Sequence, residues 1–219
     1  MFSCGRARRG NRTYEFSAAN TALLAIDMQR EFFTEDVGEF VEEMRAIVPR
    51  VAALIELARS LGCRVIHTRE SYSPDLSDVT PYRRFLDYVG KPGPLGRFCI
   101  RGEPGHDLVE EVHPLQNETV IDKAGFGAFY RTDLDRQLRA AGIDHLILCG
   151  ITTQCCVHST LREAVDRGYW CLTVADCCAA SEPGMHDAAL GLIAGEGHLF
   201  GWVCNLADVS EGTAALHSQ

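Results

Sequence analysis

Residues 149–158, which read CGITTQCCVH, contain the side chains best suited to do chemistry in this chain. They join an apolar run to a helical pattern through a sharp Gly-Ile-Thr-Thr turn. Such a turn can place a thiol at a helix N-terminus, where unpaired backbone N–H groups and the helix dipole favour the thiolate. Cys156 is therefore a candidate nucleophile, and the backbone N–H groups of Thr152 and Cys156 are candidates for an oxyanion hole.

Two ionisable residues at the ends of other apolar runs could assist this thiol. Asp27 lies near the end of the run TALLAIDM, and Lys123 directly follows the run TVID. A cysteine nucleophile needs a base that takes and returns its proton, and a carboxylate can do both. A lysine beside them stabilises the thiolate and the carboxylate, and a lysine at an apolar strand end is costly without an anionic partner. We therefore predict that Asp27, Lys123 and Cys156 form one catalytic group.

The elements that must position this group alternate along the chain. Short apolar runs predict strands at residues 21–28, 64–68, 119–122, 145–151, 170–175 and 199–204. Amphipathic stretches, each followed by Gly, predict helices at residues 40–61, 132–141, 156–167 and 183–194. This alternation predicts a single three-layer α/β/α domain with a mostly parallel six-stranded sheet of Rossmann-like type. Sites in such sheets lie outside the carboxyl ends of the strands, where all three candidates fall.

Two segments fall outside this alternation. Residues 1–18, which are rich in Gly and Arg, are expected to form a flexible N-terminal tail before a single domain at 19–219. Residues 69–118 are rich in Pro, Gly and charge and hold too few periodic elements to form a second domain. We expect them to be a long loop insertion over the sheet edge, and such loops tend to be functional.

Composition limits the class of protein. The net charge of −9 over 219 residues argues against nucleic acid or an anionic membrane as a partner. No apolar run approaches the roughly 18 residues of a membrane span, and no signal-peptide core is visible. Several of the ten cysteines lie within apolar runs, where a free cysteine behaves as a small hydrophobic residue. The chain has no two CxxC motifs that could together bind zinc, so we expect no structural zinc site. We expect a cytoplasmic protein without a cofactor.

The motifs AIDMQREF, VIDKAGFGAFYRTDLD and GITTQCCVHSTLREAVDRGY together resemble the isochorismatase-like cysteine hydrolases. That family includes nicotinamidases, N-carbamoylsarcosine amidases, ureidoacrylate amidohydrolases and biuret or triuret hydrolases. The resemblance implies an Asp-Lys-Cys triad at Asp27, Lys123 and Cys156, with Cys156 rather than Cys155 as nucleophile because it precedes the motif's Val. It also implies a cis peptide between Ile151 and Thr152, a small amide substrate, and a homo-oligomer that is a dimer or tetramer.

Within the family, related nicotinamidases carry an Asp-x-His metal site after the second strand. That segment here, HTRESYSPDLSD, has no His beyond His67, so we expect no metal. The stretches TRESYSPDLSD, GPLGRFCIRGEPGHD and LTVADCCAA are most similar to the biuret and triuret hydrolases. This similarity implies cleavage of a small carbamoyl-urea, with release of ammonia through a thioester intermediate.

Four further residues are candidates for contacts with the substrate. Glu196 could accept a terminal NH2 group, Arg69 or Glu70 could frame the pocket entrance, and Phe129 could be pocket wall or core. Three alternatives remain: a ureidoacrylate or N-carbamoyl amidohydrolase, an isochorismatase-type ether hydrolase, and a non-catalytic oligomeric relative. Isochorismatase-type enzymes often dispense with the cysteine, and a silent relative would have lost a triad member. The presence of all three residues counts against both.

Overall fold

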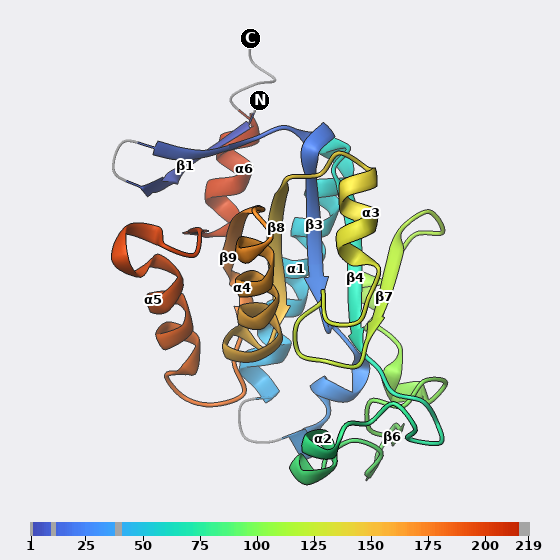
Figure 1. Ribbon diagram of the computed structural model, residues 1–219. Coiled ribbons are helices and arrows are strands. Elements are labelled where there is room, and N and C mark those ends of the chain that lie inside the picture. Colours follow the sequence, from blue (N-terminus) through green and yellow to red (C-terminus); the bar gives the residue numbers. More distant parts are fainter. Residues whose placement is uncertain (1, 10–11, 38–40, 215–219) are drawn as a thin grey trace.

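The computed structural model describes residues 2–9, 12–37 and 41–214, arranged as a sheet between two layers of helices (Figure 1). The strands are β1 Phe2–Arg9, β2 Arg12–Phe16, β3 Thr21–Ile26, β4 Arg64–Glu70, β5 Pro92–Gly93, β6 Gly96–Arg97, β7 Thr119–Lys123, β8 His145–Ile151, β9 Trp170–Ala179 and β10 Trp202–Cys204. The helices are α1 Val41–Leu61, α2 Pro81–Leu86, α3 Leu134–Ala140, α4 His158–Asp166, α5 Met185–His198 and α6 Leu206–Ala214.

The central sheet has six strands in the order β10-β9-β8-β3-β4-β7, and neighbouring strands pair in parallel throughout. From β3 the chain proceeds outward through β4 and β7, and then returns to place β8 on the other side of β3. The reversal creates a topological switch point between β3 and β8. In open α/β sheets a crevice opens at this point, outside the carboxyl ends of the two strands.

Each face of the sheet carries its own hydrophobic core, because alternate residues of a strand point to opposite faces. Leu23 and Ala25 of β3 pack with the buried side of α1, whereas Ala22, Leu24 and Ile26 pack with α3 and α4. All six residues of β3 are buried. This accounts for the continuous apolar run, which is typical of a central parallel strand covered on both faces.

The predicted fold class is confirmed, and the six predicted sheet strands all form. Boundaries differ most late in the chain, where β9 continues to Ala179 and β10 begins only at Trp202. The predicted helix at residues 156–167 is also divided. A π-helical turn, Thr153–Val157, precedes α4, which begins at His158. None of the described helices is both long and apolar enough to cross a bilayer.

The N-terminal segment differs from the flexible tail expected at residues 1–18. Its described residues form an antiparallel pair, β1 with β2, and Tyr14 and Phe16 are buried in the core that contains α1. Tyr14 also donates a hydrogen bond to the carbonyl of Leu146 on β8. The basic composition of the segment did not predict this packing. It depends on two aromatic side chains at alternate positions of a short strand, which point to the same face and bury apolar surface. Residues 1, 10 and 11 lie outside the described part of the chain.

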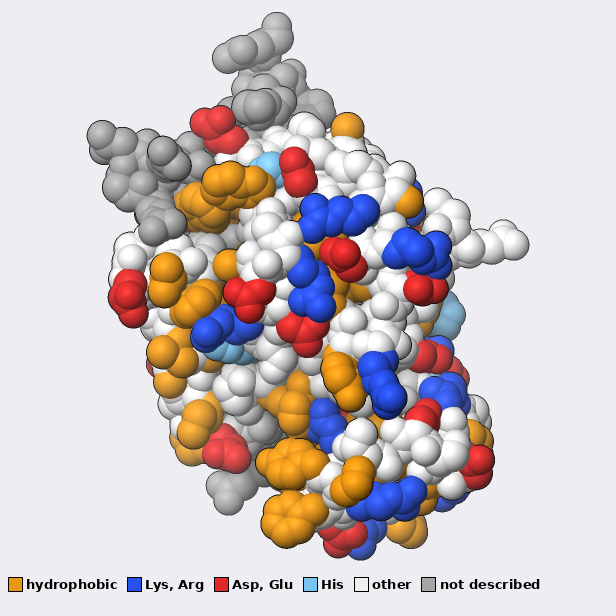
Figure 2. All heavy atoms as spheres, in the orientation of Figure 1, with side chains coloured by type: hydrophobic (Ala, Val, Ile, Leu, Met, Phe, Trp, Pro, Cys, Tyr) orange, Lys and Arg blue, Asp and Glu red, His pale blue; other side chains and the backbone are white. Residues whose placement is uncertain are grey.

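The segment between β4 and β7 has more structure than the predicted loop insertion. It contains α2, the short strands β5 and β6, and a small core of its own made by Tyr72, Val79, Cys99 and Ile100. Its first two predicted residues, Arg69 and Glu70, belong to β4. On the outer side of α2, Tyr82 and Phe85 stack with their ring centroids 6.2 Å apart. Figure 2 shows exposed hydrophobic side chains at the lower end of the molecule and along its left side, next to intermixed charges of both signs.

A buried carboxylate, Glu118, ties the start of β7 to α1 and β4. Its side chain accepts two hydrogen bonds from Arg59, each 2.8 Å long, and lies 3.1 Å from His67 Nε2. Burial raises the pKa of Glu118, but the hydrogen bonds from Arg59, the Leu115 N–H and His67 outweigh burial and lower this pKa to about 2. The ionised carboxylate therefore stabilises the fold above the pKa of an unfolded Glu, near pH 4.3.

We expect Glu118→Gln to lower the free energy of unfolding at pH 7 by about 2 to 3 kcal/mol. The deficit should shrink as the pH falls from about 5 towards 2, because the wild-type carboxylate then takes up its proton. Urea denaturation of both proteins across this range measures the effect. Glu111→Gln, at an exposed position, is the matched control for net charge. A deficit that stayed constant between pH 7 and pH 2 would contradict the assignment.

Candidate active site

The carboxyl ends of β3 and β8 approach each other very closely at the switch point. A Cβ atom at Gly150 would lie 2.1 Å from the carbonyl oxygen of Ile26, and Gly150 has a φ of 111°. A side chain at this position would push the two strands apart. Glycine therefore allows the turn after β8, which carries Cys156, to lie against the turn after β3, which carries Asp27.

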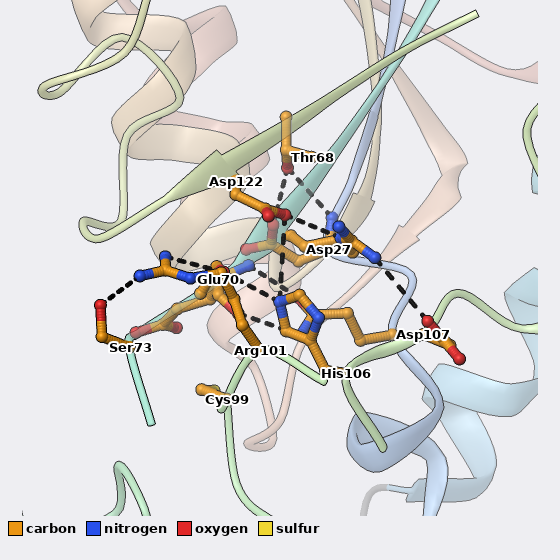
Figure 3. Close-up of polar contacts among 12 residues, drawn as sticks. Asp27, Thr68, Glu70, Ser73, Cys99, Arg101, His106, Asp107 and Asp122 are labelled. Carbon is orange, nitrogen blue, oxygen red and sulfur yellow. Dashed lines mark hydrogen bonds and ion pairs between the residues drawn. The ribbon is translucent and has the colours of Figure 1, made fainter. Parts of the chain in front are cut away.

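Asp27 is the first residue after β3, and its backbone turns sharply there with a φ of 52°. Aspartate tolerates this left-handed conformation better than most residues. Its N–H donates to the carbonyl of Thr68 on β4 (3.1 Å), and the Thr68 hydroxyl donates to Asp27 Oδ1 (2.6 Å). Figure 3 shows this contact between the neighbouring strand ends. Thr68 thus orients the carboxylate and leaves Oδ2 to face Lys123.

Lys123, the last residue of β7, reaches across β4 to this carboxylate. Its ammonium lies 2.7 Å from Asp27 Oδ2 and donates to the carbonyl of Gly125 (2.9 Å), and both charged side chains are buried. Burial lowers the pKa of Lys123, but the negative charge of Asp27 raises it more, with further contributions from Cys156 when it is ionised and from Glu70, so that the net shift is upward. Lys123 is therefore a permanent buried cation.

Cys156 lies in the π-helical turn, Thr153–Val157, and lines a cavity of about 480 Å³ together with Asp27 and Thr152. Its sulfur lies within 4.8 Å of a carboxylate oxygen of Asp27. The peptide bond between Ile151 and Thr152 is cis, as the family resemblance implies. The structure thus brings together the three predicted catalytic residues and the two residues predicted to provide oxyanion N–H groups.

The electrostatics of Cys156 differ from those expected for a helix N-terminus. The interaction with the Cys155 thiol raises the pKa of Cys156, burial and the charge of Asp27 raise it further, and together they outweigh the opposing charge of Lys123. The helix dipole acts mainly on the first turn, and Cys156 precedes α4 within a buried π-helical turn. Cys156 is accordingly a thiol at rest, and a base must remove its proton during attack.

Glu70, the last residue of β4, also faces this cavity. One of its carboxylate oxygens lies within 4.8 Å of both the Cys156 sulfur and an Asp27 oxygen. Gln29 holds its backbone, since the Glu70 N–H donates to Gln29 Oε1 (2.6 Å) and Gln29 Nε2 donates to the Glu70 carbonyl (3.0 Å). Of the four predicted substrate contacts, Glu70 is the one that lines the cavity.

The other three predicted contacts require correction, because none of them lines this cavity. Arg69 points to the opposite side of β4 from Glu70, where its Nε donates to Asp122 (2.8 Å). Phe129 is buried in the core, where its ring lies 5.7 Å from that of Tyr169. Glu196 is exposed, in a break in α5 where its φ is 50°.

Several cavity residues were not among the predicted site residues. Aromatic side chains form much of the wall, and charged side chains lie at its outer part; the described residues of these two kinds are Phe32, Tyr88, Phe98, Phe126, Asp36, Asp87 and Lys91. Four of them belong to the segment between β4 and β7, whose path cannot be inferred from periodicity. Thr68 could have been found, because it is a polar residue near the end of a buried strand next to β3.

Asp27, Glu70 and Cys156 are also the kinds of side chain that ligate metals. Their ligand atoms lie within 4.8 Å of one another, the one grouping of this kind among the described residues. However, the Lys123 ammonium lies 2.7 Å from Asp27 and would repel a second cation at that carboxylate. The arrangement therefore fits a site in which lysine supplies the positive charge.

The chain is similar to several known proteins in sequence and in structure. A family model described as the isochorismatase domain matches residues 21–208. A ureidoacrylate amidohydrolase of Methylorubrum extorquens is 31% identical and aligns over 93% of this chain and 85% of its own length. An Arabidopsis thaliana protein named a probable inactive nicotinamidase is 35% identical over 77% of this chain and 85% of its own length. The crystal structure of a cysteine hydrolase from Pseudomonas syringae superposes with a TM-score of 0.81 at 28% identity, covering 92% of this chain and 96% of that one.

The chain therefore belongs to the isochorismatase family of hydrolases. The prediction of a hydrolase is confirmed at the level of the family. The similarity to the biuret and triuret branch is not among these matches and stays a prediction. Because one relative is named as probably inactive, membership of the family does not by itself establish activity.

The raised pKa of Cys156 has a measurable consequence. We expect the rate of Cys156 alkylation by iodoacetamide to rise with a midpoint above the value of about 8.5 for a free cysteine. Asp27→Asn should move this midpoint to lower pH, because it removes a negative charge that opposes thiolate formation. Tandem mass spectrometry separates Cys156 from Cys155, and Asp187→Asn at an exposed position is the control. A midpoint that is unchanged or higher in Asp27→Asn would contradict the electrostatic assignment.

Proposed function

We propose that this protein is a cysteine amidohydrolase that cleaves a C–N bond of a small ureido or carbamoyl compound. One observation carries the proposal: a buried Asp27–Lys123 ion pair lies beside a thiol, in a cavity at the switch point of the sheet. A base, a fixed cation and a nucleophile in this arrangement are the requirements of thiol-dependent acyl transfer. The amidohydrolase names among the relatives support the same class of reaction.

In the proposed mechanism, Asp27 takes the proton of Cys156 as sulfur attacks the carbonyl carbon and the S–C bond forms. Asp27 then gives this proton to the departing nitrogen, the C–N bond breaks, and ammonia or an amine leaves. Water, deprotonated by Asp27, attacks the resulting thioester-type intermediate, the C–S bond breaks and the thiol recovers its proton. Lys123 remains charged throughout and stabilises each anionic state of Asp27 and Cys156.

The developing negative charge on the carbonyl oxygen needs hydrogen-bond donors. We assign this role to the backbone N–H groups of Thr152 and Cys156, because both residues line the cavity beside the nucleophile. Such donors commonly contribute about 3 to 4 kcal/mol each to the transition state of acyl transfer.

Two substrate classes fit the proposal, and charge separates them. The described charged residues at the outer cavity are Asp36, Asp87 and Lys91, and Lys91 is paired with Asp87 at 2.9 Å. This net negative charge favours a neutral carbamoyl-urea, such as biuret or triuret, over an anion. The second candidate is ureidoacrylate, an anion, which the name of the Methylorubrum relative favours.

Ammonia release from biuret, triuret, ureidoacrylate, N-carbamoylsarcosine and nicotinamide tests the proposal. We expect the wild-type protein to hydrolyse at least one ureido compound, Cys156→Ala to be inactive, and Asp27→Asn to lose at least about 100-fold in kcat/KM while remaining folded. Circular dichroism checks the fold of each variant. Retained activity in Cys156→Ala, or a folded and silent wild-type protein, would overturn the proposal. The latter outcome would favour a non-catalytic relative.

A paired variant tests the charge argument. We expect Asp36→Asn/Asp87→Asn to raise kcat/KM for ureidoacrylate relative to biuret by roughly 2- to 5-fold at low ionic strength, because it removes two surface carboxylates and frees Lys91. Asparagine suits position 87, where φ is 57°. The gain should vanish in 0.5 M salt, at about a 4 Å Debye length. An unchanged ratio at low salt would contradict the preference for neutral substrates.

A further inference from the structure

We infer that Glu70, held by Tyr72, Tyr88 and Arg83, accepts hydrogen bonds from the N–H groups at the carbamoyl end of the substrate. It thereby selects amides and ureas over substrates without such donors. The inference rests on the proposed function and deepens it. In this inference, the segment between β4 and β7 positions the carboxylate of Glu70. The neighbouring triad supplies reactivity, whereas this second cluster supplies recognition.

All described contacts of the Glu70 carboxylate converge on one of its oxygens, Oε1. The hydroxyl of Tyr72 donates to Oε1 (2.9 Å), the hydroxyl of Tyr88 also donates to it, and Arg83 Nη1 lies 3.7 Å away. Among the described residues no group donates a hydrogen bond to Oε2. One oxygen is therefore anchored by protein, and the carboxylate keeps an acceptor for a ligand.

The anchoring groups are themselves fixed by the fold. Arg83 is buried, its Nη1 donates to the Tyr88 hydroxyl (2.8 Å), and its guanidinium lies 3.3 Å above the ring of Phe126. Thr80 caps α2 by accepting from the N–H of Arg83, and this holds the helix that carries the cation. Because Arg83 pairs with Glu70 as Lys123 pairs with Asp27, the two buried cations balance the two buried carboxylates.

The position of Glu70 relative to the triad determines what it can bind. Carboxylate oxygens of Asp27 and Glu70 and the Cys156 sulfur lie within 4.8 Å of one another. A carbonyl carbon in contact with this sulfur places its amide nitrogen near both carboxylates, and an NH2 group has two hydrogens to donate. A bound substrate without N–H donors would exclude water from the free Glu70 oxygen and leave it unpaired, which is a strong basis for discrimination.

The test compares two substrates in the same variants. One is the ureido compound turned over best by the wild-type protein, and the other is p-nitrophenyl acetate, an activated ester that needs the thiol but has no N–H group. We expect the ratio of their kcat/KM values, ureido to ester, to fall by about 10- to 100-fold in Glu70→Gln. Most of the loss should appear in KM for the ureido compound.

The positioning residues supply a second variant and a matched control. Tyr88→Phe should lower the same ratio by about 3- to 10-fold, because it removes one anchor of Glu70 and leaves the carboxylate in place. Tyr82→Phe, on α2 with its side chain exposed, should leave the ratio unchanged. Unchanged ratios in both Glu70→Gln and Tyr88→Phe, with normal wild-type turnover of the ureido compound, would overturn the inference alone. A wild-type protein that hydrolyses only the ester would overturn the proposed function as well.

Discussion

The buried ion pair between Asp27 and Lys123 is the interaction on which the rest of the site depends. Both side chains are almost completely inaccessible, with 1% and 0% of their surfaces exposed. Loss of either partner would leave an uncompensated charge in the core, at a cost of about 3 to 5 kcal/mol. Asp27 directly follows β3 and Lys123 ends β7, and these strands flank β4, so the pair also spans three adjacent strands. Catalytic geometry and sheet register are therefore coupled.

This ion pair sets the state of the nucleophile. Asp27 raises the pKa of Cys156 and Lys123 lowers it, within a turn where the Cys155 thiol and burial both favour the protonated form. A resting thiol is protected from adventitious oxidation, which follows thiolate character and exposure. In the proposed mechanism it becomes nucleophilic only when a carbonyl group arrives and Asp27 takes its proton, so that reactivity is limited to the moment of substrate binding.

A second buried pair, Glu70 with Arg83, repeats this pattern one strand further along. Its cation comes from α2 rather than from the sheet, so its position depends on the segment between β4 and β7. The sheet therefore positions the Asp27–Lys123 pair, whereas the segment between β4 and β7 forms part of the cavity wall.

The sheet, and the convergence of Asp27, Lys123 and Cys156 at one of its edges, could be predicted from the sequence alone. Apolar periodicity is a local property, and it located the six strands, while the parallel topology brought the strand-end residues Asp27, Lys123 and Cys156 to one edge. The side chains that surround these residues depend on how distant parts of the chain pack together. Arg69 and Glu70 are adjacent in β4, yet strand alternation turns one towards Asp122 and the other towards Cys156. Phe129 lies in the hydrophobic core, and Glu196 lies outside the cavity. Arg83 and Tyr88 reach Glu70 through a segment without periodicity, because their positions depend on contacts between residues far apart in the chain.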